Sequence, residues 1–269
     1  MFKLKTPHTT VDGAMGTELQ KKGLTQDPVL YNLSHPQAII DIHKSYLSAG
    51  ADIITANTFG AYSHKHTNSH ELIRMAIKNG REALYGHKNK WLALDMGPTG
   101  QMLEPYGDMT EDECFEIFLQ AAKAGADADL IIIETMMDLN ELTLAVKAAK
   151  ETGLPIFTTM AFDKNGRTMM GNTIDGMLDA LDNKVQAIGL NCGMPNDYAP
   201  LAAELKSKTK LPIIIQPNAG LPHTSTQGNA IYNLTPQEFA AQLSAMEIAI
   251  VGGCCGTSPE YIKLLSKSA

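Results

Sequence analysis

Two adjacent cysteines, Cys254 and Cys255, follow a short apolar run at residues 248–251 after two glycines, and a third, Cys192, ends a similar run. We interpret both runs as buried strands, so three thiols are expected at strand ends. Zinc accepts thiolates in tetrahedral geometry, and a catalytic zinc keeps its fourth position for an exchangeable ligand. Three cysteines would leave that position open for thiol chemistry. The fourth cysteine, Cys114, lies in an acidic stretch and is expected to be an ordinary helix residue.

Adjacent side chains of a regular strand point to opposite faces, so Cys254 and Cys255 can reach one ion only where the chain bends. Three glycines beside them permit such a bend: Gly252, Gly253 and Gly256. Spacing alone leaves two other interpretations open. The cysteines can be buried small apolar residues, as free cysteines often are, or the adjacent pair can form a vicinal disulfide.

The chain has 269 residues, of which 44% are hydrophobic and 19% charged, so it can bury a large core. The net charge of −7 and the lack of a basic stripe argue against nucleic acid as a partner. We find no signal-peptide core and no apolar run that could cross a bilayer, and therefore expect a cytoplasmic location without a membrane partner. Thiols stay reduced there, which favours a metal or catalytic role for clustered cysteines.

An amphipathic helix, a turn and a buried strand form the repeated pattern of the chain. Residues 36–49 carry apolar side chains at near-helical spacing, with Pro36 suited to the first turn and Gly50 to the C-terminal stop. An apolar strand follows at 51–58, and a similar phrase returns at 124–135. Continuous apolar strands that alternate with helices predict a parallel sheet covered by helices.

Eight predicted strands have C-terminal ends at Asp12, Asn57, Asp95, Glu134, Thr159, Asn191, Asn218 and Gly252. We expect one helix in each interval between them. Eight such units in about 250 residues indicate a (β/α)8 TIM barrel, with a doubly wound sheet as the alternative. No linker-like stretch divides the chain, so we predict a single domain at 1–269. The chemistry-bearing residues would then lie at the C-terminal mouth of the barrel, where such folds place their active sites.

Seven short phrases occur in order along the chain, at residues 12–19, 57–61, 97–100, 134–135, 191–192, 217–220 and 252–260. Together they closely resemble the homocysteine S-methyltransferase family. The resemblance covers nearly the whole chain and implies a zinc-dependent (β/α)8 barrel that methylates homocysteine to methionine. It also implies that Cys192, Cys254 and Cys255 are the zinc ligands.

Within that family, the phrases at 57–61 and 256–260 are similar to the branch that forms the N-terminal homocysteine-binding module of cobalamin-dependent methionine synthase. The branch that uses S-methylmethionine usually has arginine at the position of Gly256. Methionine synthase continues into folate, cobalamin and reactivation modules, and we expect none of these in this chain. The resemblance therefore favours a methyl-corrinoid on a separate protein as the methyl donor.

Two acidic residues at predicted strand ends, Asp12 and Glu134, can pair with the ammonium group of homocysteine, and the resemblance assigns both to substrate binding. The alternative is that an acid in such a position merely caps a helix. Gly13 allows the backbone to approach the substrate carboxylate closely. Asn218 is expected to orient the substrate or to occupy the fourth zinc position before the substrate arrives.

Three further polar residues are expected at the mouth of the barrel. Asn191 precedes Cys192 and is expected to support that ligand. Asn57 and Thr58 follow the second strand and are expected to contact the substrate. A polar stretch with three histidines is expected to be an exposed loop or helix start rather than a metal site; they are His64, His66 and His70.

Two small-molecule donors, S-methylmethionine and betaine, are alternatives to the corrinoid. Both are cations, and a cation without a nearby carboxylate is often held by an aromatic cage. Aromatic residues make up only 6% of the chain and residues 17–29 contain none, which disfavours betaine. A further alternative is a non-catalytic homocysteine- or zinc-binding module of a larger assembly.

Overall fold

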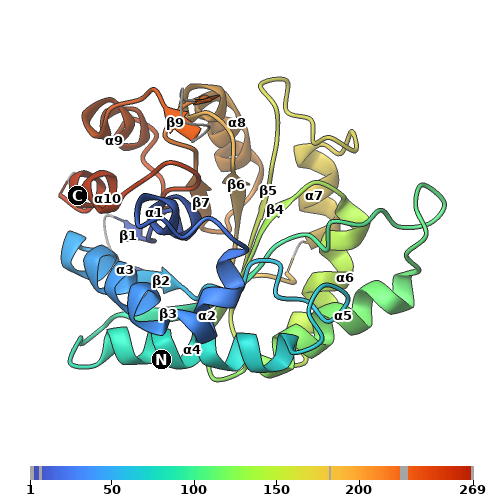
Figure 1. The fold of residues 1–269 in the computed structure, drawn as a ribbon. Coiled ribbons are helices and arrows are strands. Elements are labelled where there is room, and N and C mark those ends of the chain that lie inside the picture. The colour runs from blue at the N-terminus through green and yellow to red at the C-terminus, as the bar shows by residue number, and fades with distance from the viewer. Residues whose placement is uncertain (1–2, 6–7, 182, 225–229, 268–269) are drawn as a thin grey trace.

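Eight parallel strands form the centre of the molecule in the computed structural model, which describes residues 3–5, 8–181, 183–224 and 230–267. Helices surround these strands (Figure 1). The central strands are β1 (Thr9–Thr10), β2 (Ile53–Thr55), β3 (Trp91–Met96), β4 (Leu130–Met136), β5 (Ile156–Met160), β6 (Ala187–Asn191), β7 (Ile213–Gln216) and β10 (Ile250–Val251).

The central strands close into a barrel. Neighbouring strands pair in the order β1-β10-β7-β6-β5-β4-β3-β2, and every pair is parallel. The two end strands meet through a parallel bridge between Val11 and Ile53, where the Asp12 amide donates to the Ile53 carbonyl at 3.0 Å. This closure confirms the predicted (β/α)8 TIM barrel and excludes the doubly wound sheet, whose edge strands stay open.

Helices cover the outside of the barrel. They are α1 (Met15–Lys21), the 3-10 helix η1 (Pro28–Leu30), α2 (Tyr31–Ser34), α3 (Pro36–Ala49), α4 (Ser69–Leu84), α5 (Glu111–Ala124), α6 (Leu139–Lys150), α7 (Ile174–Leu181), α8 (Pro195–Lys208), α9 (Pro236–Ser244) and α10 (Pro259–Leu265). The predicted bounds of α3 are confirmed, and Gly50 ends this helix with a left-handed φ of 107°. The last helix, α10, packs beside α3 and completes the outer ring (Figure 1).

Local sequence signals set where several of these helices begin. Thr110 and Glu113 form a capping box at the start of α5, and Thr235 and Glu238 form another at the start of α9. Helices α3, α8, α9 and α10 carry proline in their first turn. Because each large helix follows the C-terminal end of a strand, these starts also limit the length of the loops at the barrel mouth.

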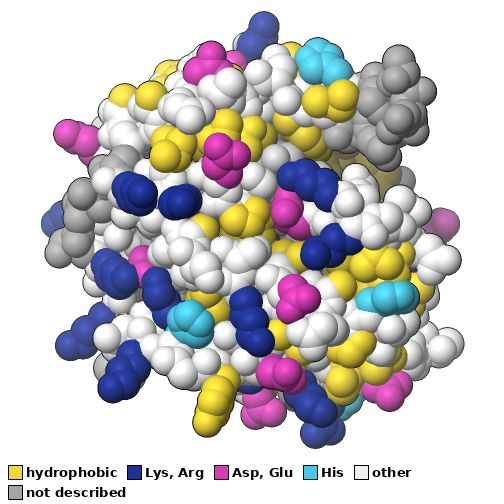
Figure 2. Space-filling model, turned by 60° about the vertical axis from the view of Figure 1, so that its left-hand side comes forward, with side chains coloured by type: hydrophobic (Ala, Val, Ile, Leu, Met, Phe, Trp, Pro, Cys, Tyr) yellow, Lys and Arg dark blue, Asp and Glu magenta, His cyan; other side chains and the backbone are white. Residues whose placement is uncertain are grey.

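The outer surface carries charges of both signs. On the face shown in Figure 2, Lys and Arg side chains are interspersed with Asp and Glu, and hydrophobic side chains lie between them. Within the described ranges, none of the helices has both the length and the apolar character that a bilayer crossing requires.

A small hydrophobic cluster fills the interior of the barrel, while a larger one lies between the strands and the helices. The interior cluster consists of Val11, Ile53, Ala93, Leu130, Ile132, Phe157, Ala187, Ile214 and Ile250. Gly189 of β6 pairs with Ile214 of β7, and a Cβ atom at Gly189 would overlap the Ile214 carbonyl oxygen. A glycine is therefore required here by close backbone approach.

Two intervals depart from the expected pattern of one helix each. The first contains α1, η1 and α2 before α3, because prolines at positions 28 and 36 each start a new helical segment. The seventh contains an antiparallel hairpin of β8 (Pro222–Thr224) and β9 (Ala230–Tyr232) before α9. Strands of three residues carry too little periodicity to be distinguished from loops in the sequence, which is why the hairpin was not predicted.

The substitution Gly189→Ala should destabilise the barrel, because its methyl group would overlap backbone in a packed interior. We expect the free energy of unfolding in urea to fall by about 1–3 kcal/mol. Gly176→Ala in α7 is the matched control, since its methyl group would meet the nearest atom, Thr173 Oγ1, at 3.5 Å. Alanine favours a helix, so this control should be neutral or stabilising by up to about 1 kcal/mol. Equal stability of the two variants would contradict the close approach.

Candidate metal and substrate site

A cavity of about 520 Å³ lies at the C-terminal ends of the barrel strands, the end at which barrel enzymes place their active sites. Seven residues predicted from the sequence line it: Asp12, Gly13, Asn57, Glu134, Cys192, Cys254 and Cys255. The other three predicted residues, Asn191, Asn218 and Thr58, are hydrogen-bonded to segments of the cavity wall. Thr55, Asp95 and Tyr232 also line the cavity, although the sequence suggested no role for their side chains.

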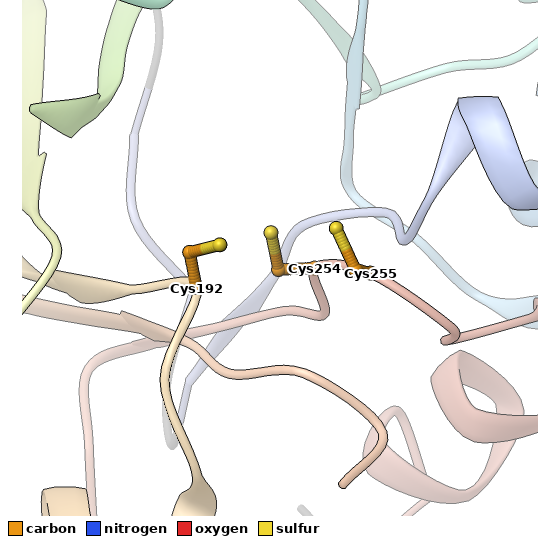
Figure 3. Close-up of side chains that lie close together, drawn as sticks. All are labelled: Cys192, Cys254 and Cys255. Carbon is orange, nitrogen blue, oxygen red and sulfur yellow. The ribbon is translucent and has the colours of Figure 1, made fainter. Parts of the chain in front are cut away.

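The sulfur atoms of Cys192, Cys254 and Cys255 lie within 4.8 Å of one another, and all four cysteines of the chain are free thiols. Figure 3 shows the sulfurs of the adjacent pair on the same side of their loop, with the Cys192 sulfur turned toward them. A tetrahedral zinc with sulfur bonds of about 2.3 Å holds its sulfurs about 3.8 Å apart, so this cluster fits the ion. The adjacent pair forms no disulfide, and Cys114 is a buried residue of α5, as expected.

The backbone turns these thiols toward one point. Cys192 has a left-handed φ of 63°, which is uncommon for a residue other than glycine, and its N–H donates to the Gln216 carbonyl at 3.1 Å. The Cys254 N–H donates to the Pro217 carbonyl at 2.8 Å. Gly256 then turns the chain with a φ of 81°. The chain therefore leaves regular strand geometry at the cysteine pair, which is how neighbouring side chains come to share one side.

Asn218 joins the two cysteine-bearing loops through its side chain. Its Nδ2 donates to the Cys192 carbonyl at 2.9 Å, and its Oδ1 accepts from the Cys255 N–H at 3.1 Å. Nδ2 also lies 4.0 Å from the Cys192 sulfur. With both amide atoms engaged, Asn218 sets the separation of the loops that carry the thiols.

Thr257 ties the same region to α3 and to the loop after β1, a role that sequence reasoning missed. Its hydroxyl donates to the Cys254 carbonyl at 2.6 Å, and its carbonyl accepts from the Tyr46 hydroxyl at 3.0 Å. Tyr46 also donates to the Ala14 carbonyl at 2.9 Å. A Cβ atom at Gly13 would lie 2.6 Å from the Thr257 hydroxyl, so this contact requires glycine. Thr257 lies in the phrase at 252–260, which was the only sequence signal for it.

Asp12 and Glu134 are acids with raised pKa values in the cavity wall. Thr55 donates to both Asp12 oxygens, from its N–H at 2.9 Å and from its hydroxyl at 3.0 Å. Burial nevertheless raises the pKa of Asp12 to about 8, and burial followed by the nearby Cys255 thiolate raises that of Glu134 to about 7. Asp12 does not cap α1, which begins after Ala14 without a side-chain cap.

Asp95 of β3 is a third acid in the same wall. The residue is 8% exposed, and its Oδ1 has no hydrogen-bond partner among the described residues. Burial, with the charges of Glu134 and Asp12, raises its pKa well above the ordinary value. Thr58 holds the backbone of Asp95, since its hydroxyl donates to the Asp95 carbonyl at 2.7 Å and accepts from the Asp95 N–H at 3.1 Å. The sequence showed Asp95 only as a strand end.

Asn191 and Asn57 bond to neighbouring segments of the mouth. Asn191 Oδ1 accepts from the Thr135 N–H and from the Thr159 hydroxyl, both at 2.8 Å, and its Nδ2 donates to the Thr135 hydroxyl at 2.7 Å. Thr135 has a left-handed φ of 60°, so these bonds stabilise an uncommon backbone conformation. Asn57 Nδ2 donates to the Pro28 carbonyl at 2.7 Å. Both side chains thus fix strand ends and loops that shape the cavity.

The three histidines lie in a polar loop and at the start of α4, but His64 and His66 are half-buried rather than exposed. His64 Nε2 lies 3.0 Å from the Thr99 carbonyl, and His66 Nε2 lies 3.2 Å from the Asp27 carboxylate. His70 is exposed in the first turn of α4. In the part of the chain that the structure describes, the three cysteines are the group of His, Cys, Asp and Glu residues with metal-ligand spacing.

Comparison with known proteins finds relatives along nearly the whole chain. Two methionine synthases, from Mycobacterium leprae (strain TN) and Mycobacterium tuberculosis (strain ATCC 25618 / H37Rv), are each 31% identical to it over 94% of its residues. The matched part is 23% and 24% of those proteins, so the chain spans about a quarter of their length.

Solved structures share the fold. The metallated form of the homocysteine methyltransferase MmuM from Escherichia coli superposes with a TM-score of 0.82 at 21% identity, covering 98% of this chain and 97% of that one.

The family model described as homocysteine S-methyltransferase matches residues 9–269. With that match across the barrel and its cysteine cluster, the chain belongs to the homocysteine S-methyltransferase family.

Proposed function

We propose that this barrel transfers a methyl group to the sulfur of homocysteine and forms methionine, with zinc held by Cys192, Cys254 and Cys255. The observation that carries this proposal is the convergence of three free thiols in one cavity with buried carboxyl groups. Family membership and the 31% identity to methionine synthases support the same reaction. We propose the three cysteines as the catalytic residues because they would hold the reacting sulfur through the metal.

Three thiolates form a soft donor set that is typical of zinc, with a fourth position left for a substrate thiol. The Escherichia coli relative has been solved in a metallated form, which supports a metal in this fold. When bound, zinc would supply the Lewis acidity that deprotonates the homocysteine thiol at neutral pH. The three cysteine thiolates would add negative charge around that sulfur and so favour its attack on a methyl group.

The carboxyl groups are suited to the ammonium end of homocysteine. We propose that Asp12 and Glu134 pair with this ammonium, and that the hydrogen bonds from Thr55 keep Asp12 in a fixed orientation. The backbone at Gly13 approaches the cavity without a side chain and can receive the substrate carboxylate. Holding both ends of the amino acid would aim its sulfur at the donor, which is how orientation accelerates such a transfer.

The polar residues around the mouth then have positioning roles. Asn218 would hold the cysteine loops at metal-binding separation, and Asn191 would hold the ends of β4, β5 and β6 together. Asn57 and Thr58 would shape the substrate end of the cavity through the loop at Pro28 and through Asp95. A role for Asn218 as the fourth ligand before substrate binds would require its Oδ1, which accepts from the Cys255 N–H in this structure, so we propose the loop-holding role for this side chain.

The proposed donor is a methyl-corrinoid on a separate protein. The relatives named methionine synthase support this choice. The family resemblance supports it too, because Gly256 stands where the S-methylmethionine-using branch usually has arginine, and a side chain there would overlap the Tyr232 ring. A second candidate donor is a small cation such as S-methylmethionine or betaine. Phe59 and Tyr232 line the cavity and would offer such a cation aromatic faces.

Zinc content should depend on the three clustered cysteines. Replacing Cys192, Cys254 or Cys255 by alanine should remove most of the zinc that copurifies with the protein, because each removes one of three ligands. Cys114→Ala is the matched control and should keep about one zinc per chain, since this residue lies in α5. Elemental analysis of the purified proteins measures the metal. An undiminished zinc content in Cys254→Ala would show that the cluster is not the metal site.

Methionine formation should identify the donor. We expect purified protein with homocysteine to form methionine from a methyl-corrinoid protein, and to form little from S-methylmethionine or betaine. Chromatographic measurement of methionine with each donor in turn tests this. Rapid turnover with S-methylmethionine alone would overturn the corrinoid proposal and favour the small-cation donor. Tight homocysteine binding without turnover from any donor would favour a binding module of a larger assembly.

The Asp12 carboxyl should contribute a loss of stability as pH rises from about 6.5 to 8. Its pKa is about 8 in the folded chain and about 3.9 when unfolded, so folding retains a proton that the unfolded chain loses. The free energy of unfolding should drop by up to about 1.4 kcal/mol per pH unit. We start the pH range at 6.5 because of His43, whose pKa burial lowers to about 4 in the folded chain. Below pH 6.5 the unfolded chain protonates this histidine and the folded chain does not, so His43 opposes the effect of Asp12 there.

Urea unfolding of Asp12→Asn beside the wild type isolates this carboxyl from other titrating groups, because only the difference between the two proteins is used. The difference should depend on pH, whereas Asp41→Asn, at an exposed position of α3, should follow the wild type throughout. A difference between wild type and Asp12→Asn that stays constant from pH 6.5 to 8 would rule out this assignment.

A further inference from the structure

Asp95 is a buried acid of the cavity wall whose role the reaction proposed above does not explain. Its side chain is more than nine-tenths buried, it lines the same cavity as the cysteine cluster, and its Oδ1 has no partner among the described residues. A buried carboxyl oxygen without a hydrogen bond destabilises the folded state unless a ligand or another group supplies a donor. The cavity is therefore the place to look for that donor.

The surrounding structure holds Asp95 in position. The Thr58 hydroxyl bonds to both the N–H and the carbonyl of Asp95, so the backbone at this strand end is fixed on two sides. This clamp also ties the loop after β2 to β3. A carboxyl group on a fixed backbone has only its own side-chain torsions to lose on binding, which suits it to recognising one group of a ligand.

A cation within the chain does not satisfy Asp95 in the described structure. Lys65 lines the outer part of the cavity and is exposed, with its amino group near Gly100 and its charge acting on Glu141. Asp12 and Glu134 act on Asp95 as like charges. The local charges therefore favour a positively charged ligand group close to Asp95.

Three acids from three strands face this cavity, namely Asp12 after β1, Asp95 on β3 and Glu134 on β4. A primary ammonium group has three N–H donors at tetrahedral directions. Three separate acids can each accept one of those donors. A quaternary ammonium or a sulfonium has no N–H donor, so the acids would attract it by charge alone.

We propose that Asp95 is a further substrate-binding residue that accepts the third N–H of a primary ammonium group and so sets the preference of the cavity for α-amino thiols. This inference rests on the proposed function for the identity of the thiol. It adds a third acid to Asp12 and Glu134. The preference of the cavity for a thiol with an amino group over one without would then depend on Asp95 of β3.

The test compares two ligands that differ in one group. Homocysteine and 4-mercaptobutanoate share the thiol and the carboxylate, but only homocysteine has the ammonium. Calorimetric titration of each into zinc-loaded protein gives two dissociation constants, and their ratio is the preference. Asp95→Asn keeps the shape of the side chain, but its amide cannot take up a negative charge when an ammonium group binds. It should lower the preference by about 10- to 100-fold, the range that hydrogen bonds to charged groups support.

If Asp95 had only a structural role, its replacement would weaken the binding of both ligands. The inference therefore requires that the variant bind 4-mercaptobutanoate about as tightly as the wild type does. Asp41→Asn is the matched control, because it makes the same chemical change at an exposed helix position. Zinc content and circular dichroism should match the wild type in both variants. If Asp95→Asn does not fold, Asp95→Ser replaces it, with the same expected loss of preference.

Two outcomes would overturn the inference, and one other would separate it from the proposed reaction. An unchanged ratio in the Asp95 variant, or a wild type that binds both ligands equally, would show that Asp95 does not recognise the ammonium. A wild type that prefers homocysteine through Asp95, but forms no methionine from any donor, would support the inference and defeat the proposed reaction.

Discussion

The end of β7 holds the two cysteine-bearing loops in one place, and the geometry of the cavity depends on it. Because β7 pairs with β6 on one side and with β10 on the other, its last residues touch both loops. The carbonyls of Gln216 and Pro217 accept from Cys192 and Cys254, and the Asn218 side chain bonds to both loops. Thiols that are 62 residues apart in the sequence thus meet within 4.8 Å.

Acids and thiols gather in the cavity that this arrangement creates. Three thiols and the acids Asp12, Asp95 and Glu134 line one space of about 520 Å³. Burying such groups together disfavours their charged forms, which is why the pKa values of the three acids are raised. A divalent metal at the thiols and an ammonium group at the acids would each offset this cost. The cavity is therefore electrostatically suited to a metal together with a cationic ligand.

The same cavity suggests how a methyl donor would reach the substrate. The chain matches about a quarter of the length of methionine synthases, and the matched part is this barrel. In the proposed reaction the barrel holds the methyl acceptor, and the donor must approach from the open mouth. The hairpin of β8 and β9 borders that mouth, and its Tyr232 ring fills the space beside Gly256. This pair of residues would limit the size of the group that approaches the thiols.

Much of this molecule was predictable from local sequence signals. Apolar periodicity, Pro36 and Gly50 set the bounds of α3, and the alternation of strands and helices indicated the barrel. Strand ends placed the cysteines at the mouth. Only the tertiary structure decided that Asn218 joins the cysteine loops and that Asp95 has an unpaired buried oxygen. Such contacts depend on strand register and on closure between distant segments, so no neighbouring residues in the sequence encode them.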